Sequence, residues 1–183
     1  MREHFATEDV PDETLIERWR SGDERAAAVL VERHAPALSR FAVSLGERDE
    51  LDELVQDTFV KAFGSLDGFR GESEFRTWLF AIARRLVADR RRSGARRREV
   101  APVDETERSR EADALERLVA EETGGRVQSA VATLTRLQRE VFTLRVSEGL
   151  SYREIADVLD STEGAARVHY HNAVRRVKEA LDD

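Results

Sequence analysis

Apolar residues recur along this chain at intervals of three and four positions, which is the spacing of one face of an α-helix. No stretch alternates in strand fashion for more than a few residues. A first apolar stripe begins at Leu15, and a second continues to about Gly46. Pro36 stands inside the second stripe and predicts a kink or a division of that helix. The pattern as a whole predicts an all-α protein.

Two further helices are predicted in the first half of the chain. One begins near Asp49, with acidic residues in its first turn where the helix dipole favours them, and ends before Gly64. The other runs from about Ser73, a plausible N-cap, to Arg92. Each of them carries an apolar stripe that is expected to face a core.

The periodicity is interrupted over residues 93–125, which are rich in Asp, Glu, Arg and Ser and poor in apolar residues. It returns at Arg126 in a helix that Gly149 is expected to end, followed by a last helical pair. We therefore expect two small helical domains, over residues 10–93 and 126–181. A flexible acidic linker over residues 94–125 is expected to join them.

The formal net charge is −7, but it is distributed unevenly. Residues 1–68 carry −8, residues 69–98 carry +7, residues 99–125 carry −6, and residues 126–183 carry zero. A block of arginines in an otherwise acidic chain indicates a surface that binds a polyanion. Because phosphate neutralisation supplies much of the energy of DNA binding, the neutral C-terminal domain is expected to bind DNA only modestly by itself.

The segment 150–181 has the pattern of a helix-turn-helix. Ser151 can cap a short helix, and a polar turn at 160–162 precedes a longer one. One stripe of the longer helix is apolar and core-facing: Ala166, Tyr170, Ala173, Val174, Val177 and Leu181. The other face suits a major groove, since Asn172 can read adenine, Val168 can contact a thymine methyl and Arg175 or Arg176 can hold phosphate. Helical hairpins with this spacing also occur in proteins that never touch DNA.

The helix predicted over 73–92 mixes aromatic residues with arginines, a composition that suits single-stranded nucleic acid. Phe75 and Trp78 fall on its core-facing stripe, so Trp78 is expected to be packed in part. Phe80 lies off the stripe and is predicted to be the exposed aromatic. A duplex-reading domain joined to a single-strand-binding domain predicts a protein that recognises double-stranded DNA and captures melted DNA.

Other functions are disfavoured by what the sequence lacks. Without cysteine there are no disulfides, thiolate metal sites or thiol nucleophiles. His169 and His171 point about 200° apart on a helix, so no metal site is predicted there. No cofactor is expected either. An enzyme is not predicted, since there is no Gly-rich phosphate loop and no catalytic arrangement of Ser, His and Asp. The absence of a long apolar run or a secretory start leads us to expect no membrane insertion and a cytoplasmic location.

Three motifs together resemble the extracytoplasmic-function (ECF) sigma factors, the small two-domain class of bacterial RNA polymerase initiation factors. They are DELVQDTFVKAF at 52–63, FRGESEFRTWLFAIARRLVADRRR at 69–92 and LSYREIADVLDSTEGAARVHYHNAVRRVKEAL at 150–181. The resemblance extends from Leu15 to Leu181. It implies a helical bundle called sigma region 2 at 10–93, a helix-turn-helix called sigma region 4 at 126–181, and no catalysis by the chain itself.

The resemblance also implies roles for individual residues. The helix at 52–63 would dock on the clamp helices of core polymerase through Asp52, Glu53, Gln56, Asp57 and Lys61. The segment from 69 onward would capture a flipped base of the minus-ten box and act in melting through Phe69, Arg70, Ser73, Phe75, Trp78, Phe80, Arg84 and Arg85. The helix-turn-helix would read the minus-thirty-five box through Tyr152, Arg153, Arg167, Val168, His171, Asn172, Arg175 and Arg176.

The chain departs from the family pattern at two places. The family often has Asn where Arg85 stands, and a Lys/Arg-Ser-Arg series where Arg167, Val168 and His169 stand. Promoter preference is therefore not given by the resemblance. The partners that it implies are core RNA polymerase, through its clamp helices and flap, promoter DNA, and an anti-sigma factor.

A second class of function also fits the pattern: a free-standing helix-turn-helix transcriptional regulator whose N-terminal domain senses a ligand or dimerises. Such a regulator should bind duplex DNA specifically by itself, whereas a sigma factor should bind core polymerase and show little promoter affinity alone. The sequence leaves open whether the two domains pack together.

Overall fold

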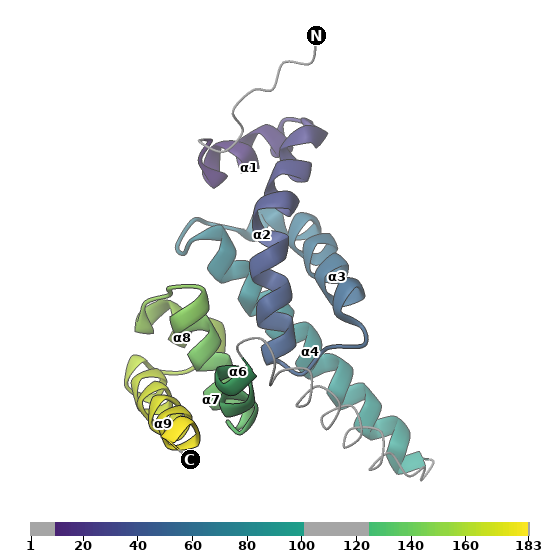
Figure 1. Cartoon of the computed structure of the whole chain (residues 1–183). Helices are drawn as coiled ribbons and strands as arrows, with labels where there is room; N and C mark the ends of the chain where they lie inside the picture. The colour runs from purple at the N-terminus through teal and green to yellow at the C-terminus, as the bar shows by residue number, and fades with distance from the viewer. Residues whose placement is uncertain (1–9, 101–124, 183) are drawn as a thin grey trace.

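The structure, a computed structural model, describes residues 10–100 and 125–182, with side chains over 10–93 and 126–182. Its elements are α1 (Asp12–Arg20), α2 (Glu24–Ser44), α3 (Leu51–Gly64), the 3-10 turn η2 (Leu66–Gly68), α4 (Phe75–Val100), α6 (Gly125–Ala132), α7 (Arg136–Phe142), the π-helical turn η3 (Thr143–Ser147), α8 (Tyr152–Leu159) and α9 (Glu163–Asp182) (Figure 1). No strand occurs within these ranges, and the all-α prediction is confirmed. None of the helices described there is both long enough and apolar enough to cross a membrane.

Helix α2 remains a single helix of 21 residues although Pro36 lies inside it. Asp23 caps its start by accepting a hydrogen bond from the Arg25 amide at 3.0 Å. Buried leucines lie on either side of the proline, Leu30 before it and Leu38 after it. Since tertiary packing supplies most of the stability of a helix in a protein, packing on both sides of Pro36 keeps the helix undivided.

Helix α4 is the central helix of the N-terminal bundle and packs against α2, α3 and α8 (Figure 1). It begins at Phe75, so Ser73 does not occupy the expected N-cap position. It also continues past the expected end at Arg92 to Val100. The Gly of the Ser93-Gly94 pair lowers helix stability by only about 1 kcal/mol, which does not end a helix that continues into Ala and Arg. The rest of the expected acidic linker, residues 101–124, lies outside the described residues.

The segment from Arg126 to Gly149, predicted as one helix, is divided into α6, α7 and η3. A capping box begins α7: the Thr135 hydroxyl accepts from the Gln138 amide at 3.4 Å, and the Gln138 side chain accepts from the Thr135 amide at 3.1 Å. This Thr-x-x-Gln signal is visible in the sequence, but the apolar periodicity runs through it. Local capping therefore sets a boundary that periodicity does not detect.

The N-terminal bundle and the C-terminal helices pack against each other. Leu144, Ile155 and Leu159 from the C-terminal part belong to the same apolar cluster as Phe41 and Leu79 from the bundle. A smaller cluster inside the C-terminal part contains Ala130, Leu134, Ala173 and Val177. The arrangement that the sequence left open is thus a closed one.

Polar contacts border this interface. The carboxylate of Glu148 is buried and accepts two hydrogen bonds from the Arg40 guanidinium, at 2.8 and 3.1 Å. These bonds raise the pKa of Arg40 despite the opposing effect of burial. The Thr77 hydroxyl donates to Glu154 at 3.3 Å, and Arg76 donates to the Glu148 carbonyl at 3.0 Å. Directional bonds of this kind fix how α8 sits on α4.

Candidate nucleic-acid interface

The turn between α8 and α9 is built by local sequence. Ser151 and Glu154 form a capping box, in which the Glu154 carboxylate accepts from the Ser151 amide at 2.8 Å. The pKa of Glu154 is lowered, because hydrogen bonds from Ser151 and Thr77 and the charge of Arg76 outweigh the effect of its burial. Asp160 closes α8 in the left-handed region, with φ of 52°. The predicted cap at Ser151 and the predicted helix-turn-helix are both confirmed.

Helix α9 has one packed face and one open face. Ala166, Ala173 and Val177 are buried, as the helical pattern predicted. Val168 is 58% exposed, and four charged or titratable side chains are exposed with it: Arg167, His171, Arg175 and Arg176. Asn172 is half-buried and accepts a hydrogen bond from Arg175 at 3.2 Å. The face expected to read DNA is thus largely open to solvent.

Tyr152 lies between two guanidinium groups. Arg145 and Arg167 each lie 4.9 Å from the centre of its ring, and Arg145 also donates to the Leu150 carbonyl at 2.6 Å. Stacking of this kind orients the two cations while leaving them charged. Arg145 was not among the predicted site residues, because it comes from η3 and only the folded chain brings it beside α8 and α9. Arg153 is exposed on α8.

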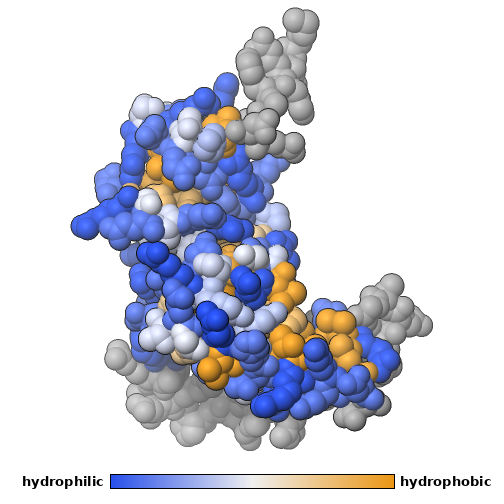
Figure 2. Space-filling view, turned by 90° about the vertical axis from the view of Figure 1, so that its left-hand side faces the viewer, coloured by the Kyte–Doolittle hydropathy of each residue, from blue (hydrophilic) through white to orange (hydrophobic). Residues whose placement is uncertain are grey.

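The side of the molecule on which α8 and α9 lie in Figure 1 faces the reader in Figure 2. Hydrophilic side chains cover most of it, and apolar ones form smaller patches among them. A surface of this composition suits a charged, hydrated partner such as a nucleic acid. It suits less well the apolar interface of a permanent protein complex.

The exposed face of α3 is acidic and is linked to α4 by Arg90. Asp52, Glu53, Gln56 and Lys61 are exposed, and Asp57 is half-buried. The Arg90 guanidinium forms ion pairs with Glu50 at 3.0 Å, Glu53 at 3.2 Å and Asp57 at 2.7 Å. Burial opposes the charge of Arg90, but these carboxylates raise its pKa. The sequence did not reveal this pairing, because the partners lie far apart along the chain.

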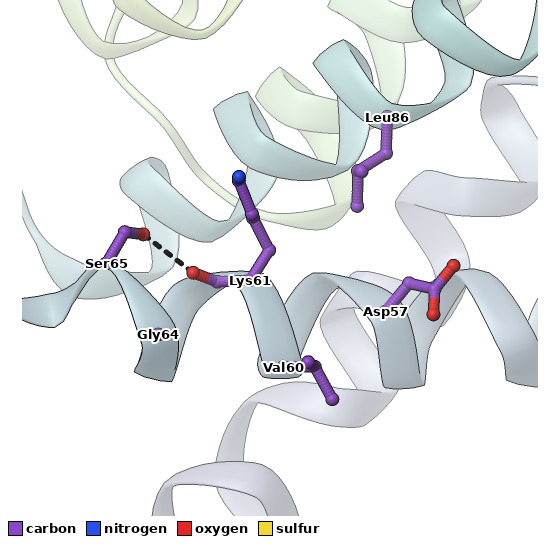
Figure 3. Close-up of a pocket in the computed structure, with 6 residues that line it drawn as sticks. All are labelled: Asp57, Val60, Lys61, Gly64, Ser65 and Leu86. Carbon is purple, nitrogen blue, oxygen red and sulfur yellow. Dashed lines mark hydrogen bonds between the residues drawn. The ribbon is translucent and has the colours of Figure 1, made fainter.

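An open hollow of about 300 Å³ lies between α3 and α4 (Figure 3). It is lined by Asp57, Val60, Lys61, Gly64, Ser65 and Leu86, with Leu86 on α4 opposite the α3 residues. Val60 is 65% exposed, the largest value among the exposed large apolar side chains of the described residues. Single exposed apolar side chains are normal on protein surfaces, so Val60 alone does not mark a binding face.

The loop between η2 and α4 contains the residues expected to capture a base. Phe69 and Ser73 are half-buried and Arg70 is exposed. The ring of Phe69 lies 5.0 Å from that of Trp78 and 5.8 Å from that of Phe75. The half-buried Trp78 agrees with the expectation of partial packing.

Two aromatic residues that the resemblance assigns to minus-ten DNA lie in the core, and the burial of Phe75 confirms its place on the core-facing stripe. Phe75 and Phe80 are each 1% exposed. The prediction of Phe80 as the exposed aromatic is therefore wrong, and neither ring is open to a base in this arrangement. The ring of Phe80 lies 5.1 Å from that of Phe41 on α2. Because α4 is covered by several helices, residues off its main stripe are buried as well.

The two arginines expected near the melting site differ in their surroundings. Arg85 is exposed, whereas Arg84 donates to Glu140 of α7 at 3.0 Å. Glu140 is 1% exposed and also accepts from Arg136 at 2.8 Å. In the closed arrangement Arg84 thus serves the contact between the two parts of the chain.

No set of three or more metal-binding side chains gathers within the described residues. His169 and His171 lie on α9, and His34 is hydrogen-bonded to Asp12 at 2.7 Å. His4 lies outside the described residues.

Comparison with known families gives two matches in order along the chain. Residues 30–97 match Sigma-70 region 2, and residues 124–177 match Sigma-70 region 4. The ECF RNA polymerase sigma-E factor of Salmonella typhimurium is 31% identical over 186 residues, covering 97% of this chain and 95% of the relative. That of Haemophilus influenzae is 29% identical over 185 residues, with 96% of each chain covered.

Two solved structures have the same fold. CnrH, in complex with the cytosolic domain of CnrY, superposes with a TM-score of 0.67 at 30% identity, covering 93% of this chain and 97% of CnrH. The sigma factor RpoE from Bartonella quintana, in complex with the anti-sigma factor NepR, gives 0.66 at 25% identity, with 87% and 97% covered. Helical regions 2 and 4 in this order, with a relative above 30% identity along nearly the entire chain, show that it belongs to the ECF family of RNA polymerase sigma factors.

Proposed function

We propose that this chain attaches to core RNA polymerase and directs it to promoters, where it recognises both promoter boxes and helps to melt the DNA. The observation that carries this proposal is the open face of α9, which presents groove-compatible side chains in a chain that also has a region 2 bundle. Sigma factors are in general non-enzymatic DNA-recognition subunits, and we assign no catalysis to this one. The cytoplasm, where core polymerase meets the chromosome, is the proposed place of action.

We assign polymerase binding to α3, where Asp52, Glu53, Gln56 and Lys61 are exposed and Asp57 is half-buried. The assignment is supported by the acidic character of this exposed face. Clamp helices are the proposed partner of α3, and the polymerase flap is the proposed partner of region 4. Release of Glu53 or Asp57 from Arg90 would let these carboxylates meet a basic partner.

We assign minus-ten recognition to the loop after η2 and to the accessible side of α4. The direct contacts proposed are Phe69, Arg70, Ser73, Trp78, Arg84 and Arg85, while Phe75 and Phe80 support them from the core. A flipped base can stack on Phe69 or Trp78, and the arginines can meet the backbone. Since Arg84 is paired with Glu140, it must leave this partner before it can contact DNA.

We assign minus-thirty-five recognition to α8 and α9. The residues proposed are Tyr152, Arg153, Arg167, Val168, His171, Asn172, Arg175 and Arg176. In this scheme the functional units span 10–93 and 126–181, and residues 94–125 tether them. An anti-sigma factor is a further proposed partner, supported by the similarity to RpoE, which was solved with one.

The proposal is tested by transcription in vitro with core polymerase and a library of genomic promoters. The chain should direct initiation from a subset of them, while binding duplex promoter DNA only weakly by itself. Asp52→Arg should reduce core binding by reversing a charge on α3, whereas Glu32→Arg, a charge reversal at an exposed position of α2, should not. Specific duplex binding without polymerase, and no initiation with it, would support the free-standing regulator instead.

A further inference from the structure

Helix α1 lies before the region 2 match, which begins at residue 30, yet it contacts the loop proposed to capture the minus-ten base. The guanidinium of Arg20, the last residue of α1, donates to the Leu66 carbonyl at 2.7 Å and to the Phe69 carbonyl at 3.2 Å. One side chain thus holds two carbonyls, one in η2 and one at the first residue of the capture loop. A planar guanidinium is suited to this, because its donors are fixed relative to one another.

The same helix is bonded to α2, and α2 in turn contacts the far end of the loop. Asp12 of α1 accepts from Arg33 at 2.6 Å and from His34 at 2.7 Å. Partial burial opposes the charged form of Asp12, but these partners outweigh it and lower its pKa, so the carboxylate is ionised at neutral pH. The ring of His34 lies edge-on to Phe75 at 5.5 Å, where the loop enters α4.

Helix α1 also makes an apolar contact with α3. The ring of Trp19 lies 5.2 Å from that of Phe63 in the last turn of α3, directly before η2. Helix α1 therefore contacts the elements before residues 69–74 directly and is linked to Phe75, after them, through His34 of α2. Arg20 is the α1 residue that bonds to the loop backbone itself.

We propose that Arg20 is a positioning residue for minus-ten recognition: it holds the Leu66 and Phe69 carbonyls so that the capture loop is already in place when a base is flipped out. A preformed loop loses less conformational entropy on binding than one that must be ordered by the base. The inference rests on the function proposed for this loop. Since Arg20 is itself exposed, the alternative role is a direct contact with DNA phosphate, and the two roles make different predictions.

The first test measures amide hydrogen exchange in the free protein. Arg20→Ala should speed exchange in the peptide spanning residues 66–70, where the Phe69 amide donates to the Leu66 carbonyl, and leave the other helices unchanged. Arg18→Ala is the matched control, because Arg18 is an exposed arginine in the same last turn of α1. Unchanged exchange in Arg20→Ala would overturn the proposal, and general acceleration throughout the bundle would show a role in folding instead.

The second test uses holoenzyme and a single-stranded oligonucleotide with the non-template minus-ten sequence of a promoter that is active in the transcription assay. Arg20→Ala should weaken this complex about three- to tenfold, with affinity for core polymerase unchanged. Arg20→Lys should be impaired too: both bonds come from one nitrogen of the planar guanidinium, whose N–H directions are fixed, whereas a lysine ammonium is on a shorter side chain and rotates freely. The salt dependence of binding should stay that of the wild type.

Two outcomes would overturn the inference. Full activity of Arg20→Lys, together with a salt slope reduced by about 1 in Arg20→Ala, would identify Arg20 as a phosphate contact. Wild-type affinity in Arg20→Ala would show that the loop needs no support from α1. Neither result would contradict the function proposed for the loop. That function is contradicted if the wild-type holoenzyme does not bind the oligonucleotide.

Discussion

The two helices proposed to meet DNA, α4 and α9, are embedded in the molecule in different ways. Helix α9 packs along one face on α6, α7 and α8, and its other face is open. Helix α4 is packed by α2, α3 and α8, and two of its residues expected at DNA, Phe75 and Phe80, are core residues. The helical pattern placed the buried residues of α9 correctly. On α4 it placed Phe75 correctly on the core-facing stripe but left Phe80 off it, because helices cover α4 on more than one side.

The difference also concerns how ready each surface is to bind. Arg167, Arg175 and Arg176 on α9 are exposed, whereas Arg84 on α4 is engaged with Glu140. In the closed arrangement, therefore, the surface proposed to read the minus-thirty-five box is exposed, while Arg84 of the proposed minus-ten surface is bound within the chain. The three predictions that follow test this contrast.

The largest effect is expected from Phe80→Ala. Removing a fully buried ring from the contact with Phe41 should lower the free energy of unfolding by about 3–5 kcal/mol, measured by urea denaturation. Val168→Ala on α9 is the contrasting variant and should change stability by less than about 0.5 kcal/mol, because Val168 is exposed. Similar stabilities for the two variants would contradict the contrast between α4, which is packed on several sides, and α9, which is packed on one.

A smaller effect, on recognition, is expected from Asn172→Ala. If Asn172 reads an adenine through two hydrogen bonds, the variant should lose about 1–3 kcal/mol of preference at one base pair of the minus-thirty-five box. Transcription from promoters substituted at each position of that box measures the preference. Arg175→Ala should instead weaken all promoters alike, since a phosphate contact carries no sequence information. An unchanged preference in Asn172→Ala would show that another residue reads the box.

The smallest effect is expected from Glu140→Gln, which keeps the shape of the side chain and removes its charge. Arg84 and Arg136 are partly exposed, so solvent screens the loss and the free energy of unfolding should fall by only about 1 kcal/mol. Regions 2 and 4 should separate more often, which can be followed by fluorescence transfer between dyes on Glu17→Cys and Lys178→Cys in this cysteine-free chain. Glu179→Gln, on the exposed side of α9, is the control. An unchanged distance distribution would show that the pair of Arg84 and Glu140 does not hold the two regions together.

Much of the fold could be predicted because it depends on local signals. Asp23 and Ser151 begin helices by capping, and buried Ala166 and Ala173 follow the helical period. The predicted boundaries fail where local signals compete: α4 continues through Ser93-Gly94, and Thr135 begins a new helix inside an apolar run. Helix ends depend on energies of about 1 kcal/mol, which neighbouring packing readily outweighs.

The site could be predicted only in part. The exposed face of α9 and the acidic face of α3 follow from periodicity and from the family motifs. Arg145 beside Tyr152, Arg90 among the α3 carboxylates and Arg20 at the loop carbonyls were not predicted. Arg90 and Arg20 reach partners distant in sequence, and Arg145 reaches Tyr152 across the turn between η3 and α8. No local pattern indicates which partner a long side chain will meet.

The sequence by itself determined that the chain is helical, that it ends in a helix-turn-helix and that its positive charge is concentrated in one block, because these properties depend on spacing and composition. Only the tertiary structure decided which side of α4 is accessible, that regions 2 and 4 share an apolar core, and that Arg84 pairs with Glu140. These features arise from contacts between residues far apart in the chain. Their energies depend on how several helices pack together, and no single segment contains that information.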